Sequence, residues 1–132
     1  MIVVDTNVIA YLLLPSEWTA AAEALYQADP SWATPVLWRS ELRNILTGYV
    51  RRGALSLESA VELQHAAQEM LCANELNIDS RNVLQLAQQS GCSAYDCEFV
   101  ALAQQTNSRL YTLDNKVLKA FPYIAKPLQK SA

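Results

Sequence analysis

The stretch MIVVDTNVIAYLLLP (residues 1–15) decides the fold expected for this chain. Ile2–Val4 is a short apolar run typical of a buried strand, and Asp5 follows it directly. A helix is predicted over Asn7–Leu14 and ends near Pro15. A carboxylate at such a junction is costly to bury unless it caps the helix or binds a cation. The stretch therefore predicts a strand-to-helix unit with an acid at the carboxyl end of the strand.

The composition is that of a globular domain. With 132 residues, of which 52% are hydrophobic and 17% charged, the chain suits one domain with a single core. No apolar run is long enough to span a bilayer, and the N-terminus lacks the pattern of a signal peptide, so we expect a cytoplasmic protein. Three cysteines without CxxC spacing and a single histidine do not predict a zinc site.

The charge balance limits the partners. A net charge of −3 gives no bulk basic footprint for nucleic acid. If four carboxylates hold cations at one site, however, the remaining charge is +1, because four negative charges are removed from −3. A polyanionic substrate is therefore compatible with the sequence, whereas unassisted, nonspecific binding to nucleic acid is not favoured.

Short apolar runs alternate with helical patterns along the chain. Strands are expected at Ile2–Val4, Ser31–Thr34, Glu75–Ile78, Leu110–Leu113 and Tyr123–Ile124. After the first helix, others are expected to start at Ser16, Pro35, Ser56, Asp79 and Ser93, with a short turn after Asp114. The helix over Leu57–Leu71 has a clear apolar stripe. This alternation predicts an α/β fold with a parallel sheet flanked by helices on both faces.

Four acids fall where such folds bind ligands. Asp5 and Asp114 each follow an apolar strand, and ligands bind outside the carboxyl ends of strands in open α/β sheets. Asp96 and Glu41 lie near helix starts, on or beside the buried face. Each acid also has a structural reading when taken alone. The readings are a helix cap for Asp5 and Asp114, a capping box with Ser93 for Asp96, and a solvated position or an ion pair with Arg39 or Arg43 for Glu41.

Taken together, the four acids favour a metal site. Carboxylates gathered at one rim repel one another and raise one another's pKa unless cations neutralise them. Oxygen ligands without His or Cys suit Mg²⁺ or Mn²⁺. The chemistry expected of such a site is metal-assisted hydrolysis of a phosphodiester.

Four segments resemble, in order, the acidic blocks of PIN domains. They are VVDTNVIAYLL, LWRSELRNIL, SAYDCEFVALA and LYTLDNKVLKAFP, and the resemblance extends from Ile2 to Pro122. The compact form is similar to VapC-type toxins of toxin–antitoxin pairs. The resemblance implies a single PIN-like nuclease domain over residues 1–132, a parallel five-stranded sheet, and a Mg²⁺- or Mn²⁺-dependent endoribonuclease in which a metal-bound water attacks the phosphorus.

The resemblance also implies roles for individual residues. Asp5, Glu41, Asp96 and Asp114 would form the catalytic and metal-binding cluster. Asp5 and Asp96 would bind a metal directly, and Glu41 and Asp114 through water or a second ion. Three polar residues would support the cluster. They are Thr6 and Asn7, which match the polar pair after the first acid, and Thr112, which is expected to support the Asp114 loop.

Partners follow from nearby cations and from the same resemblance. Arg39 and Arg43 flank Glu41, and Lys116 follows Asp114, so these three are expected to contact RNA phosphates. An antitoxin and a second copy of the chain would bind at the helices Ser16–Ala28 and Leu37–Val50. Two rival functions stay open. One is a PIN-type RNA-processing nuclease without an antitoxin, and the other is a catalytically weak domain that only binds RNA or protein.

Overall fold

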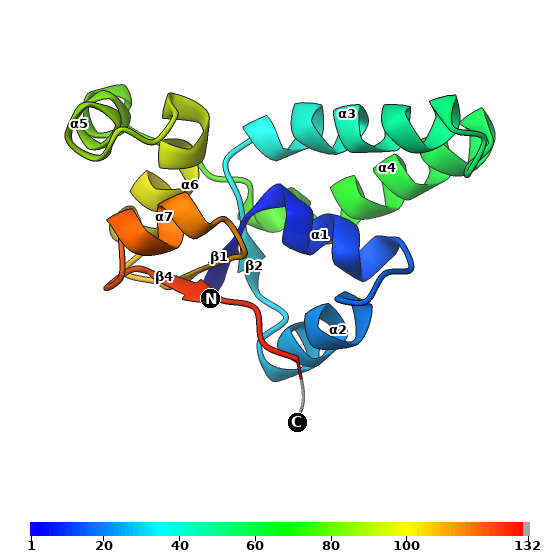
Figure 1. The fold of residues 1–132 in the computed structure, drawn as a ribbon, viewed down its shortest axis with the longest axis horizontal. Helices are drawn as coiled ribbons and strands as arrows, with labels where there is room; N and C mark the ends of the chain where they lie inside the picture. Colours follow the sequence, from blue (N-terminus) through cyan, green and yellow to red (C-terminus); the bar gives the residue numbers. More distant parts are fainter. Residues whose placement is uncertain (131–132) are drawn as a thin grey trace.

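A four-stranded parallel sheet lies at the centre of the fold (Figure 1). The structure is a computed structural model that describes residues 1–130. The strands are β1 (Ile2–Val4), β2 (Trp32–Ala33), β3 (Leu110–Thr112) and β4 (Ala125–Pro127). They run in the order β2-β1-β3-β4, and each neighbouring pair is parallel. The first and third strands are thus the inner ones, although more than 100 residues separate them in the chain.

Helices surround the sheet. They are α1 (Thr6–Leu13), α2 (Thr19–Ala28), α3 (Leu37–Arg51), α4 (Leu57–Leu71), α5 (Ser80–Ser90), α6 (Ala94–Gln105) and α7 (Asn115–Ala120), with a short 3₁₀ helix at Cys72–Asn74. In Figure 1, α1 to α4 lie on one side of β1 and β2, and α5 to α7 lie on the other. The predicted α/β class with a parallel sheet is confirmed.

The prediction of a fifth strand at Glu75–Ile78 is wrong. Only one isolated parallel bridge, between Thr34 and Glu75, forms there. Its two hydrogen bonds run from the Thr34 N–H to the Asn74 carbonyl and from the Leu76 N–H to the Thr34 carbonyl. The next residue that could donate to this segment is Val36, which is already helical, with φ −60° and ψ −19°, so the ladder ends at this bridge.

Several predicted element starts are shifted. Helix α1 begins one residue early, at Thr6, because the Asp5 carboxylate caps it. Ser16 does not cap α2: its hydroxyl accepts a hydrogen bond from the Trp18 N–H in the preceding turn. Pro35 lies outside α3, which begins at Leu37. The predicted last strand at Tyr123–Ile124 forms instead as β4.

The prediction for α4 is confirmed over its full length. The helix spans Leu57–Leu71, and the Ser56 hydroxyl accepts from the Ser59 N–H at 3.0 Å as its N-cap. The core beneath the helices contains two buried tryptophans, Trp32 and Trp38, and the buried Cys97. Within residues 1–130, no helix combines the length and the apolar character needed to cross a bilayer.

Candidate active site

Asp5 occupies the junction between β1 and α1, at the carboxyl end of an inner strand. Its backbone is extended, with φ −79° and ψ 169°, and it is the N-cap of α1. Oδ1 accepts a hydrogen bond from the Val8 N–H at 3.1 Å, and Oδ2 accepts one from the Thr112 hydroxyl. The carboxylate is therefore fixed from both sides. Asp5 caps a helix and also faces a pocket, so its role as a helix cap is compatible with a role as a metal ligand.

The electrostatics of Asp5 are unfavourable in the protein alone. Burial raises the pKa of Asp5 from 3.8 to about 6. The hydrogen bonds from Thr112 and Val8 lower this pKa, whereas the negative charges of Glu41 and Asp114 raise it. A partly buried carboxylate with acidic neighbours ionises less readily than an exposed one, and a nearby positive charge would favour its anion.

Glu41 faces the same pocket from the first half of α3. The buried Thr6 hydroxyl donates to its Oε1 at 2.7 Å and so holds the side chain against the start of α1. Burial raises the pKa of Glu41, the Thr6 hydrogen bond lowers it, and the charge of Asp96 raises it. Thr6 thus fixes the position of one acid of the pocket, and its role in catalysis stays a prediction.

Asp96 enters from the first turn of α6. Ser93 caps this helix, because its hydroxyl accepts from the Asp96 N–H at 3.0 Å. Burial raises the pKa of Asp96, and the charge of Asp114 raises it further. A hydrogen bond with the Ser93 side chain and the positive charge of Lys116 lower it. Lys116 is therefore close enough to affect the site electrostatically.

Asp114 caps α7 and is tied to Asp5 through Thr112. Its Oδ1 accepts from the N–H groups of Lys116 at 2.9 Å and Val117 at 3.2 Å. Its own N–H donates to the Thr112 hydroxyl at 3.0 Å. The same hydroxyl donates to Asp5, so one buried threonine links two acids 109 positions apart. The family resemblance implied that Thr112 supports the Asp114 loop, and the hydrogen bond from the Asp114 N–H is compatible with that role.

All four predicted acids line one pocket of about 400 Å³. Its lining residues are Asp5, Thr6, Asn7, Leu37, Ser40, Glu41, Asn44, Ile45, Tyr95, Asp96, Phe99 and Asp114. A smaller cavity of about 20 Å³ adjoins Asp5, Asp96, Asp114 and Thr112. Chain segments from four distant parts of the sequence thus bring their carboxylates to one hollow.

The donor set fits a hard divalent cation only if water completes its coordination. Within residues 1–130, no three or more His, Cys, Asp or Glu side chains are arranged so that they could hold one metal ion by themselves. Mg²⁺ commonly takes only one or two carboxylates and keeps several waters. The raised pKa values of Asp5, Glu41 and Asp96 indicate a need for positive charge in the pocket.

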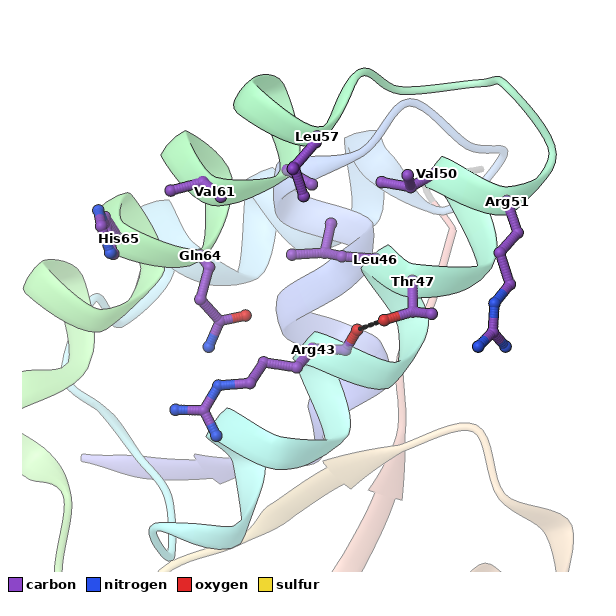
Figure 2. A pocket seen from close by; sticks show the side chains of 10 residues that line it. Arg43, Leu46, Thr47, Val50, Arg51, Leu57, Val61, Gln64 and His65 are labelled. Carbon is purple, nitrogen blue, oxygen red and sulfur yellow. Dashed lines mark hydrogen bonds between the residues drawn. The ribbon is translucent and has the colours of Figure 1, made fainter.

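Of the three cations predicted to contact phosphate, only Lys116 stays near the acids. Arg39 is held by Glu75, with Nε–Oε2 at 2.7 Å and an N–O distance of 2.6 Å from its terminal nitrogen to Oε1. Arg43 lines a different groove, on another face of α3 (Figure 2). Positions i−2 and i+2 from Glu41 point away from it on a helix. Arg39 and Arg43 therefore do not lie beside Glu41 at the pocket, where they were expected to contact phosphates.

Three further polar residues of the pocket were missed from the sequence. Ser40 and Asn44 lie on α3 beside Glu41, and Tyr95 precedes Asp96 on α6 with 64% of its side chain exposed. Asn44 could have been found, because it lies three residues after Glu41 and shares its helix face. Ser40 and Tyr95 are sequence neighbours of acids, which is too common a feature to single them out.

Comparisons with known proteins support this architecture. The family model described as "PIN domain" matches residues 2–122. The chain is 30% identical over 129 residues to "Ribonuclease VapC3" from Pyrobaculum aerophilum, covering 96% of this chain and 98% of that protein. Among solved structures, PAE2754 from Pyrobaculum aerophilum has a TM-score of 0.76 at 20% identity, with coverage of 96% of this chain and 89% of that one.

A second solved structure gives the same fold. A toxin–antitoxin complex from Klebsiella pneumoniae contains a chain with a TM-score of 0.72 at 18% identity, and the match covers 99% of this chain and 100% of that one. The four acidic blocks lie within the stretch that the family model matches. With the acids in one pocket at the edge of a parallel sheet, the chain belongs to the PIN domain family.

Proposed function

We propose that this protein is a Mg²⁺- or Mn²⁺-dependent endoribonuclease and the toxin of a toxin–antitoxin pair. The observation that carries the proposal is the convergence of Asp5, Glu41, Asp96 and Asp114 on one pocket. The similarity to a protein named as a ribonuclease supports RNA as the substrate. The similarity to a chain of a toxin–antitoxin complex supports an antitoxin as the partner.

The proposed roles divide the acids into two pairs. Asp5 and Asp96 bind the cation directly, and Glu41 and Asp114 act through water or a second ion. A bound divalent cation would supply the positive charge that polarises the phosphodiester and favours ionisation of the attacking water. Thr112 and Thr6 keep Asp5 and Glu41 in fixed positions.

Two side chains at the rim have proposed roles toward the substrate. Lys116 is exposed next to Asp114, where its ammonium group can contact a phosphate of the RNA. Asn7 lines the pocket with an exposed amide, which can orient a carboxylate or a water. Arg39 and Arg43 have no part in this proposal, because the structure directs both away from the pocket.

The products of cleavage distinguish this mechanism from its main alternative. Water attacks the phosphorus and the bond to the 3′-oxygen breaks, so the leaving oxygen takes a proton. The products carry a 5′-phosphate and a 3′-hydroxyl. Attack by the RNA 2′-hydroxyl would instead leave a 2′,3′-cyclic phosphate. Cyclic ends on a cleaved oligonucleotide would contradict the proposal.

Cleavage of total RNA by the purified protein is the direct test. We expect activity with Mg²⁺ or Mn²⁺, and its loss with EDTA or in the Asp5→Asn variant. Asp79→Asn is the matched control, because Asp79 is an exposed helix N-cap whose side chain makes no capping hydrogen bond. If the wild type does not cleave RNA, and the wild type and Asp5→Asn bind RNA equally well, the result would favour a domain that only binds RNA.

The toxin role has a separate test. Expression of the wild type is expected to arrest growth, and Asp5→Asn is expected to relieve the arrest. Co-expression of a small DNA-binding protein encoded beside this gene should also restore growth and co-purify with the chain. Cleavage without growth arrest or a co-purifying partner would favour an RNA-processing nuclease.

A further inference from the structure

Tyr95 is an exposed aromatic side chain at the edge of the acidic pocket. It is the second residue of α6, one position before Asp96, and it is 64% exposed. Within residues 1–130, seven large hydrophobic residues are exposed, and Tyr95 is the one among them that lines this pocket. Its place beside an acid therefore sets it apart from the other exposed apolar residues.

The ring of Tyr95 contributes little to the packing of the fold. Tyr95 belongs neither to the hydrophobic core nor to the partly buried residues that pack against it. Neither of the two aromatic pairs within residues 1–130 includes Tyr95. Phe99, one turn later on α6, is only 3% exposed and lies in the core. The helix thus buries one aromatic ring and leaves the other open to solvent at the pocket.

The walls of the pocket combine acidic and apolar side chains. On α3, Leu37, Glu41 and Ile45 line the pocket at intervals of four residues, so they share one face of the helix. Leu37 and Ile45 are half-buried. A divalent cation and a phosphate need oxygen ligands and charges, and apolar side chains offer them neither. The apolar part of the pocket suits a flat, uncharged group next to a phosphate, such as the base of a nucleotide.

We propose that Tyr95 binds the substrate, and that one unpaired base of the RNA stacks on its ring beside the phosphate at the acids. Successive Cα atoms lie about 3.8 Å apart, so the Tyr95 side chain starts next to Asp96 and meets a nucleotide close to that phosphate. Aromatic side chains bind bases in this way because every base has a π-face. The inference rests on the proposed nuclease function and adds a contact that selects the phosphodiester presented to the acids.

The charges around Tyr95 favour an RNA strand as the occupant. Lys116 lies close enough to Asp96 to lower the pKa of that carboxyl. A strand with one phosphate at the acids therefore finds a cation on α7 and an aromatic ring on α6. Sites for single strands combine these two contacts, because cations follow the phosphates and aromatic rings hold the bases.

Steady-state cleavage of a single-stranded RNA oligonucleotide is the first test. Tyr95→Ala should raise the KM at least about fivefold, the lower end of what base–aromatic stacking contributes, and change kcat less than about twofold. This split is expected because stacking holds the base equally in the ground state and the transition state. Tyr95→Phe keeps the ring and should recover most of the affinity. Tyr123→Ala is the matched control and should leave the KM unchanged, because Tyr123 is 89% exposed and does not line the pocket.

Abasic nucleotides identify the base that stacks. The wild type first cuts the oligonucleotide, which maps the scissile phosphate, and one abasic nucleotide then replaces each neighbouring nucleotide in turn. At one position the abasic nucleotide should raise the wild-type KM at least about fivefold, and Tyr95→Ala should add less than about twofold to it there. At the other positions Tyr95→Ala should keep its full effect. A purely structural role for Tyr95 would give no such coupling.

Binding without cleavage gives a separate measurement. Asp5→Asn is expected not to cut, so fluorescence anisotropy in Mg²⁺ can measure its equilibrium binding to the same oligonucleotide. Adding Tyr95→Ala to Asp5→Asn should raise the Kd at least about fivefold, whereas adding Tyr123→Ala should leave it unchanged. Because Tyr95 lies outside the core, Tyr95→Ala should keep the wild-type Tm, and circular dichroism checks the fold of each variant.

Four results would overturn the inference. They are an unchanged KM and Kd in Tyr95→Ala, an equal effect of Tyr123→Ala, an equal effect of Tyr95→Ala at every abasic position, and a lower kcat at unchanged KM. If Tyr95→Ala changed only the oligomeric state in light scattering, or only the co-purification of a partner protein, the ring would belong to a protein interface. If the wild type cut no RNA, the proposed nuclease function would fail, and the binding of the Asp5→Asn pair would still decide whether Tyr95 holds a base.

Discussion

The partly buried carboxylate of Asp5 predicts an unusual dependence of stability on pH. Its pKa is about 6 in the folded protein, against 3.8 for an ordinary aspartate. Between these values the folded chain keeps a proton that the unfolded chain has lost. The free energy of unfolding therefore falls as the pH rises through this window, by on the order of 3 kcal/mol from this group. Urea denaturation in EDTA at about pH 5 and about pH 7.5 measures the upper part of this fall, about 1.4 kcal/mol, because pH 5 lies inside the window.

Two variants isolate the contribution of Asp5. Asp5→Asn cannot ionise and should remove most of this fall in stability. A smaller slope should remain, because burial also raises the pKa of Glu41 and Asp96. Asp79→Asn should keep the full slope. The same slope in the wild type and Asp5→Asn would contradict this account.

Thr112 predicts a loss of both stability and activity on removal of one hydroxyl. Thr112→Val leaves the Asp5 carboxylate and the Asp114 N–H without this partner. An unpaired buried polar group costs about 1–3 kcal/mol, so urea denaturation should show a decrease of that size. Nuclease activity should fall at least about tenfold. Thr112→Ser keeps the hydroxyl and should retain most of the stability and of the nuclease activity. If Thr112→Ser lost as much of them as Thr112→Val, the role of the hydroxyl would be contradicted.

At the scale of elements, two glycines should respond to alanine in opposite directions. Gly91 ends α5 in the left-handed conformation, with φ +73°, and Gly91→Ala should lower the free energy of unfolding by about 1 kcal/mol. Gly48 lies inside α3, where an added Cβ would meet only the flexible end of Arg52 at 3.3 Å. Gly48→Ala should raise stability by roughly 0.5–1 kcal/mol. Thermal denaturation of both variants gives the signs, and the same sign in both would refute the prediction.

The ion pair between Arg39 and Glu75 predicts a structural role in place of an RNA contact. Glu75 accepts from Arg39 and from the Trp38 indole N–H at 2.7 Å, and the bond with Arg39 lowers the pKa of Glu75. Arg39→Ala should therefore lower Tm, while the KM for RNA stays at the wild-type value. Arg81→Ala, on the surface of α5, should change neither. If Arg39→Ala instead raised the KM for RNA and left Tm unchanged, Arg39 would have to contact the RNA.

The elements also show why one part of the fold escaped prediction from sequence. The run Glu75–Ile78 has strand-like residues, but the neighbouring segment turns toward α3 two residues after Thr34, so the ladder ends after one bridge. The prediction that Arg39 lies near the acids rested only on its being two residues from Glu41 in the sequence. Its actual partner lies 36 positions away, and spacing within one helix carries no information about such a contact.

At the scale of the molecule, divalent cations should stabilise the fold. Four carboxylates line one pocket, so a cation that binds there favours the folded state. Saturating Mg²⁺, at about 100 times its Kd, adds roughly 2.7 kcal/mol. Tm should rise with Mg²⁺ more at about pH 7.5 than at about pH 5, because Asp5 must lose its proton to bind. NaCl at matched ionic strength should not reproduce the rise, and neither should Mg²⁺ with Asp5→Asn.

The convergence of the acids could be predicted from sequence where an acid directly follows a predicted strand. Asp5 and Asp114 each follow a strand directly, and parallel strands place their carboxyl ends at one edge, so their convergence follows from the fold class. Asp96 and Glu41 were singled out by their places near helix starts, on or beside the buried face, and the family resemblance then assigned them to the same cluster.

The strand order has a consequence for how the protein is made. β1 is the first strand to leave the ribosome, yet its inner neighbour β3 is built from residues 110–112. The hydroxyl that fixes Asp5 and the fourth acid both arrive with that late segment. A chain interrupted before it lacks both Thr112 and Asp114, so Asp5 has no hydroxyl partner there and the pocket has three acids. The acidic pocket can therefore assemble only after this late segment has been synthesised and β3 has paired with β1.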